Sequence, residues 1–139
     1  MMAAFLILTL QAAAGECLKY EPEVVTLRGT IERHTYPGPP EYASVEAGDE
    51  KVTYWYLRLD RPLCTVAGGD DDTPAESGQT LVQLVLPAKG DHDNPYRRYR
   101  ALFGHHVDAS GKLFHQQVGR HYTKVLIHVN DMKASPREK

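Results

Sequence analysis

Alternating hydrophobic and polar positions predict that most of this chain forms β-strands. In residues 24–34 (VVTLRGTIERH), positions 25, 27, 29 and 31 are apolar or glycine, and the positions between them are polar. Residues 52–60 (VTYWYLRLD) alternate in the same way, with Trp55 on one face and Tyr54 on the other. This period of two is typical of a strand that buries one face. Three further strands are expected at residues 80–87, at residues 105–116 around a possible reversal, and at residues 121–130.

A short helix expected over residues 94–104 completes the order of elements. Asn94 is a capping residue, Pro95 suits the first helical turn and Gly104 suits the end of a helix. Three strands, one helix and two strands is the order of a five-stranded OB-fold barrel. Gly29, in the middle of the first strand, suits the bend that such a barrel requires. We therefore expect a mostly β, OB-fold-like barrel, with another small antiparallel barrel or a sandwich as the alternative.

The size of the chain indicates one domain, and its charge argues against a nucleic-acid partner. The chain has 139 residues, of which 42% are hydrophobic and 24% are charged, a balance typical of one globular domain. Its formal net charge of −2 provides no general attraction to nucleic acid, so we expect no nucleic-acid partner. We expect residues 15–139 to form a single domain, with a loose tail from about residue 132.

The first residues, MMAAFLILTLQAAAGEC, resemble an export signal. Residues 3–10 are apolar over about the length of a signal-peptide core and are too few to span a bilayer as a helix. Ala12 and Ala14 form an A-x-A pattern, which predicts cleavage between Ala14 and Gly15. No Lys or Arg precedes the apolar run, so a hydrophobic strand or helix of the fold stays open as the alternative. We expect a periplasmic or extracellular protein without stable membrane insertion of the mature chain.

The two cysteines are expected to form a disulfide. Cys17 precedes the first predicted strand and Cys64 follows the second. If these strands form an antiparallel hairpin, the start of one lies beside the end of the other. Two cysteines in an exported chain are most simply paired.

Several short patterns together resemble one family of bacterial domains. They are Cys17-x-x-Tyr20-x-Pro22-x-Val24, Leu27-x-Gly29, Pro37-Gly38-Pro39-Pro40-x-Tyr42, Tyr54-Trp55-x-Leu57-x-Leu59, Pro62-x-Cys64, Gln83-Leu84-Val85-Leu86, Tyr96-x-x-Tyr99, Gly111-x-Leu113-Phe114-His115 and Gly119-x-His121-x-Thr123. On these residues the chain resembles the uncharacterised exported family called domain of unknown function 4431. The resemblance implies a periplasmic or extracellular location and implies no particular activity.

The histidines of the last third are weak candidates for a metal site. The family's closing segment typically reads Thr-Gly-His-His-His-Thr, and residues 118–123 (VGRHYT) replace two of these three histidines. His115 and His121 flank a predicted turn, but two imidazoles without a carboxylate or thiolate make a weak zinc site. Hydrogen-bonded histidines on strands are the simpler interpretation, and we expect no cofactor. A metal-dependent or hydrolytic protein using His115 and His121 is the alternative.

A binding module fits the sequence better than an enzyme. The chain lacks G-x-S-x-G, H-E-x-x-H and a glycine-rich phosphate loop, so no catalytic motif supports an enzyme. Tyr54, Tyr56 and Arg58 share one face of the second predicted strand, opposite Trp55. In OB-folds this strand and the neighbouring loops commonly bind ligands. We expect a non-catalytic module that binds a protein or a glycan of the cell envelope. Alternatively, these tyrosines form a second hydrophobic layer under the helix or the loops.

Overall fold

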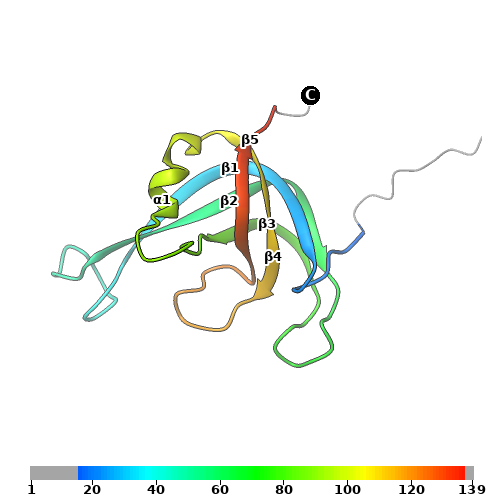
Figure 1. Cartoon of the computed structure of the whole chain (residues 1–139). Helices are drawn as coiled ribbons and strands as arrows, with labels where there is room; N and C mark the ends of the chain where they lie inside the picture. Colours follow the sequence, from blue (N-terminus) through cyan, green and yellow to red (C-terminus); the bar gives the residue numbers. More distant parts are fainter. Residues whose placement is uncertain (1–15, 137–139) are drawn as a thin grey trace, which may run out of the picture.

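The structure is a computed structural model in which residues 16–136 are described (Figure 1). The expected leader, residues 1–14, lies outside the described residues. The elements are β1 (Val24–Pro37), β2 (Lys51–Thr65), β3 (Glu76–Val85), α1 (Pro95–Arg98), the 3-10 helix η1 (Arg100–Leu102), β4 (His106–His115) and β5 (Val125–Ala134). None of the helices in this part of the chain has the length and hydropathy to cross a bilayer.

The strands close in a ring of order β1-β2-β3-β5-β4, with β4 paired back to β1. Within residues 16–136 the strand pairs are antiparallel except β3 with β5, which run parallel. The sheet is therefore mixed, and the single α-helix of the described residues lies between β3 and β4. The expected fold class is confirmed, because strand order and helix position are those of an OB-fold.

Two glycines allow close approach of neighbouring strands. Gly29 lies opposite Leu59 of β2 on one side and Val107 of β4 on the other. A Cβ atom at Gly29 would lie 2.2 Å from the carbonyl oxygen of Arg58. The same holds for β4 and β5, where a Cβ atom at Gly111 would lie 2.0 Å from the carbonyl oxygen of His128. Glycine is required at both positions because no side chain fits between the paired backbones.

The inside of the ring is a continuous hydrophobic core. Every strand contributes side chains that are completely or almost completely buried: Leu27, Ile31, Leu57, Val82, Leu84, Val107, Leu113, Val125 and Ile127. Burying one such aliphatic side chain contributes roughly 1.5–3 kcal/mol. Tyr99, between α1 and η1, belongs to the same core, and Leu102 and Phe103 pack against it. The helical segment therefore covers part of the core.

The disulfide between Cys17 and Cys64 is confirmed, with Cα atoms 4.6 Å apart. Beside it, Leu18 donates its amide to the carbonyl of Cys64 and accepts from the amide of Val66. The segment before β1 is thereby joined to the end of β2. A structural disulfide is typical of an oxidising compartment.

Three segments differ from the sequence expectations. Residues 105–116 contain no reversal, since β4 runs through them with an irregular register between Ser110 and Gly111. Residues 132–134, which were expected to belong to a loose tail, are part of β5. The helix expected over residues 94–104 is divided into α1 and η1, and Gly104 follows with a positive φ of 78°.

Candidate functional site

The three proposed binding residues of β2 lie on its outer face but in different surroundings. Tyr56 is 0% exposed. Arg58 is exposed, and its guanidinium lies 2.7 Å from the carboxylate of Glu32 on β1. Tyr54 lies on the wall of an open cleft. Of the three, only Tyr54 presents its ring to that cleft.

Tyr56 belongs to a second aromatic layer outside the ring. Its hydroxyl donates to the hydroxyl of Tyr36 at 2.9 Å. The Tyr36 ring is stacked on Tyr122, with centroids 4.0 Å apart and planes 3° apart, and Tyr54 lies 5.3 Å from Tyr122. Burial, followed by the hydrogen bond to Tyr36, raises the pKa of Tyr56, and burial also raises that of Tyr122. Both phenols stay protonated at neutral pH and can donate hydrogen bonds.

A buried glutamine of β3 holds the loop formed by residues 116–124. Gln83 is 2% exposed. Its side-chain amide donates to the carbonyl of Arg120 at 3.0 Å, and its side-chain oxygen accepts from the amide of Tyr122 at 2.7 Å. Its backbone amide donates to the Thr123 hydroxyl at 3.0 Å. These bonds fix Tyr122 over β1 and β2, and no pattern in the sequence marks Gln83 for this role.

The loop formed by residues 38–50 is held by one carboxylate. Asp49 is 6% exposed and accepts hydrogen bonds from the amides of Ser44, Glu41 and Ala43, at 2.8–2.9 Å. These bonds, with that of Ser44 contributing most, lower the pKa of Asp49. The carboxylate therefore stays charged at neutral pH and keeps the loop in one conformation.

Between two of these bonded amides lies an exposed and strained tyrosine. Tyr42 has a φ of 55° and is 66% exposed. A bulky residue with positive φ costs on the order of 1–3 kcal/mol and persists only where its surroundings impose it. Such outliers concentrate at binding and switch sites, which makes Tyr42 a candidate ligand contact.

The two loops enclose a cleft of about 1010 Å³, which we call the tyrosine cleft. Four of its lining residues are tyrosines: Tyr36, Tyr42, Tyr54 and Tyr122. The lining also contains one acid and one base, Glu50 and Arg120. Walls of aromatic rings with few charges suit a ligand that combines apolar faces with hydroxyl groups. In OB-folds the corresponding loops and the second and third strands bind ligands.

A second hollow of about 560 Å³, the middle hollow, adjoins the tyrosine cleft. Tyr54, Val118 and Arg120 line both. Gln83 and Gln117 add polar groups to its walls. The two hollows therefore form one neighbouring pair of candidate ligand sites.

The comparison with known families covers the part of the site that lies in the later half of the chain. Residues 81–133 match the family model described as domain of unknown function (DUF4431). The resemblance to this family is confirmed over that segment. No curated protein matches the chain. The DUF4431 segment includes Gln83, the 116–124 loop and both helical elements, whereas the 38–50 loop lies before it.

His115 and His121 belong to the DUF4431 segment but lie apart. His115 is 2.9 Å from a carboxylate oxygen of Glu76. His121 packs edge-on against Phe114, with ring centroids 5.5 Å apart. Because Phe114 and His115 are consecutive on β4, their side chains point to opposite faces, and so the two histidines do not share one site. Among residues 16–136 there is no group of three or more His, Cys, Asp or Glu side chains placed to hold a metal ion.

His121 supports the 116–124 loop. Its Nδ1 accepts from the amides of Gln117 and Val118, at 3.0 and 3.4 Å. Burial, followed by the charge of Arg120, lowers the pKa of the His121 imidazole. The neutral ring needed for these bonds is therefore the favoured form at neutral pH.

One cluster outside the cleft contains an Asp, a His and a Ser. The imidazole of His106 lies 2.6 Å from Asp60 through Nε2 and 2.9 Å from the Ser135 hydroxyl through Nδ1. A hydrolase triad has these residue types, but there Nε2 faces the serine. The His106 side chain is only 5% exposed, and its backbone carbonyl accepts from the amide of Ser135. We interpret the cluster as a link between β2, β4 and the residue after β5.

Proposed function

We propose that the protein is an exported, non-catalytic binding module whose ligand, a glycan of the cell envelope, lies in the tyrosine cleft. The observation that carries this proposal is the pair of fixed loops that hold Tyr42 and Tyr122 around a largely uncharged hollow. Tyrosine rings stack on the apolar faces of sugars, while their hydroxyls bond to sugar hydroxyls. Because both loops are already ordered, little conformational entropy is lost on binding.

In this proposal the residues of the outer face have separate roles. Tyr54 contacts the ligand, and Tyr56 positions Tyr36 from below through its hydroxyl. Arg58, paired with Glu32, supports the sheet beside the cleft.

Export is the second part of the proposal. The apolar leader with its A-x-A site motivates it, and the Cys17–Cys64 disulfide agrees with an oxidising compartment. The intact mass of protein recovered from the host's envelope fraction tests it. We expect a chain that begins near Gly15, and a retained leader would contradict this part.

Calorimetry with defined oligosaccharides tests whether a glycan binds in the tyrosine cleft. The probes are a neutral glucan, an N-acetylhexosamine oligomer and a uronic-acid oligomer. We expect binding of at least one of them, and about tenfold weaker binding after Tyr42→Ala or Tyr122→Ala. Val66→Ala is the control, because Val66 is 40% exposed, like Tyr122, but does not line the cleft.

Two outcomes would overturn the glycan proposal. One is that none of the three oligosaccharides binds to the wild-type protein. The other is that the tyrosine variants bind as tightly as Val66→Ala while their melting temperatures match that of the wild type. Capture of an envelope protein in place of any oligosaccharide would favour a protein ligand.

A further inference from the structure

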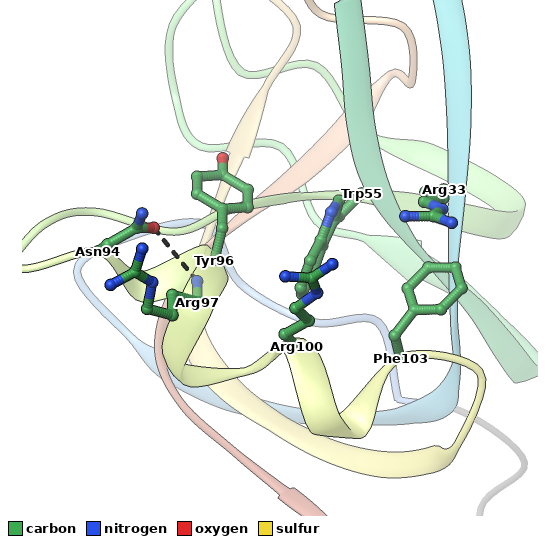
Figure 2. A pocket seen from close by; sticks show the side chains of 7 residues that line it. All are labelled: Arg33, Trp55, Asn94, Tyr96, Arg97, Arg100 and Phe103. Atoms are coloured by element: carbon green, nitrogen blue, oxygen red, sulfur yellow. Dashed lines mark hydrogen bonds between the residues drawn. The ribbon is translucent and has the colours of Figure 1, made fainter.

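A third hollow lies where the helical segment meets β1 and β2. It has a volume of about 550 Å³, and we call it the arginine pocket. Figure 2 shows its lining: Arg33, Trp55, Asn94, Tyr96, Arg97, Arg100 and Phe103. β1 contributes Arg33, β2 contributes Trp55, and residues 94–103 contribute the rest.

The three arginines of this pocket are not neutralised by carboxylates. No ion pair joins Arg33, Arg97 or Arg100 to an acid within residues 16–136, and the pocket lining contains no Asp or Glu. Other arginines of the same region are paired. Arg58 binds Glu32, and Arg98, on the same helix as Arg97, binds Asp93. Positive charge is therefore concentrated in the pocket of a protein whose net charge is −2.

Aromatic side chains hold this charge in a defined place. The guanidinium of Arg33 lies over the Phe103 ring, 4.6 Å from its centroid. Trp55 contacts Tyr96 edge-on, with ring centroids 5.4 Å apart, and also lies near Phe103. In Figure 2 Arg100 lies in front of Trp55, with Arg97 and Arg33 on either side. The pocket thus offers guanidinium groups for an anion and ring surfaces for the body that carries it.

The arginine pocket adjoins the proposed glycan site through shared lining residues. Tyr96 lines both the arginine pocket and the middle hollow, and Tyr54 lines both the middle hollow and the tyrosine cleft. Arg120 lies at the junction between the middle hollow and the cleft. One extended ligand can therefore contact the neutral cleft and the cationic pocket at once.

We propose that the ligand is an acidic glycan whose carboxylate, sulfate or phosphate groups bind in the arginine pocket. This inference rests on the proposed function and names the ligand class for it. Arginine binds such groups through two parallel hydrogen bonds, which gives direction as well as charge attraction. The tyrosine cleft binds the sugar rings, and the arginine pocket selects the acidic ones.

The test compares a uronic-acid oligosaccharide with its methyl ester, which has the same rings but no negative charge. We expect the wild-type protein to bind the free acid at least tenfold more tightly than the ester in 50 mM salt, with a smaller difference in 500 mM salt. The variant Arg97→Gln/Arg100→Gln should lose this preference. Arg61→Gln is the control and should keep it, because Arg61 lines a separate hollow with Leu59 and Leu63. Sulfated and phosphorylated oligosaccharides identify which acidic group binds best.

The outcomes separate this inference from the proposed function. Equal affinity for acid and ester, both weakened by Tyr122→Ala, would overturn the acidic ligand and leave the glycan module standing. An equal loss of preference in Arg61→Gln would show a general charge effect and would also overturn the arginine pocket. Binding of none of the acidic oligosaccharides would overturn the acidic ligand, and the glycan module would fall with it only if the neutral glucan and the N-acetylhexosamine oligomer also failed to bind. A melting curve for each variant shows that a lost preference does not reflect a lost fold.

Discussion

A single methyl group at Gly29 should strongly destabilise the protein. In Gly29→Ala the new Cβ atom would lie 2.2 Å from the carbonyl oxygen of Arg58, 2.8 Å from its carbonyl carbon and 3.0 Å from Cγ of Leu57. Real Cβ atoms do not approach other atoms closer than 3.0 Å, so β2 must retreat by roughly 0.8 Å from β1. The nearest atoms belong to the backbone and to a buried core residue, and neither can rotate away. We expect a loss of about 2–4 kcal/mol, at the upper end of overpacking effects, and at least as much for Gly29→Val.

Urea unfolding followed by tryptophan fluorescence measures this loss, because Trp55 lies on the neighbouring strand. With a slope of about 2 kcal/mol per molar urea, the midpoint should fall by roughly 1–2 M. Gly119→Ala is the matched control, since a Cβ atom there meets nothing within 4 Å and the backbone is not left-handed. It should leave the midpoint nearly unchanged. An unchanged midpoint and slope in Gly29→Ala would refute the close approach of β1 and β2.

Four further predictions concern the disulfide, one residue that supports each of the two loops, and the buried tyrosine. Replacing Cys17 and Cys64 by serine opens a link between residues 47 positions apart and should cost about 3–4 kcal/mol by urea titration. The pKa of Asp49 in the folded protein lies below its ordinary value of 3.8. The stability that Asp49 contributes is therefore present above pH 3.8 and is lost as the pH falls through the folded-state pKa. Acid titration by NMR should find the 38–50 loop loosening there, and a pKa at or above 3.8 would contradict this. The pKa of His121 in the folded protein also lies below its ordinary value of 6.5, so its bonds to the 116–124 loop should weaken as the pH falls from 6.5 through the folded-state pKa. Faster amide exchange in this loop would show the weakening, and an imidazole that titrates above 6.5 would contradict it. Tyr56→Phe should reduce the stability by about 1 kcal/mol for one lost hydrogen bond, whereas Tyr56→Ala should reduce it by about 3–5 kcal/mol, both measured by thermal melting. A small loss of stability in Tyr56→Ala would show that the ring is not packed.

The strands and their order could be predicted because burial of one face imposes a period of two on the sequence. That pattern located β1 and β2, the capping and terminating residues Asn94, Pro95 and Gly104 located the helical segment, and the placement of the cysteines indicated their pairing. The reversal expected in residues 105–116 was wrong for a physical reason. Glycine is selected both by tight turns and by close backbone approach, and Gly111 serves the second purpose, beside the carbonyl of His128 on β5. A sequence alone does not distinguish these two demands.

The candidate site was predicted only in part, because its geometry depends on contacts between distant residues. Tyr54 could be assigned to a ligand face from alternation along one strand. The burial of Tyr56 was expected only as an alternative, because alternation along one strand does not show what packs over its outer face. Gln83 and Asp49 look like ordinary polar residues until the backbone amides that they bind are placed around them.

The way in which these two loops are held is itself an argument for binding. Burying Gln83 and Asp49 costs free energy unless each polar group finds a partner, and both find theirs in the backbone of a loop. A loop that only connects two strands needs no such support, because exposed loop backbone is satisfied by water. Here the support holds Tyr42 in a strained and exposed conformation and holds Tyr122 against Tyr36. The strain at Tyr42 reduces stability and is maintained by the loop's hydrogen bonds to the buried Asp49, which agrees with the proposed ligand, because that ligand requires fixed tyrosine rings.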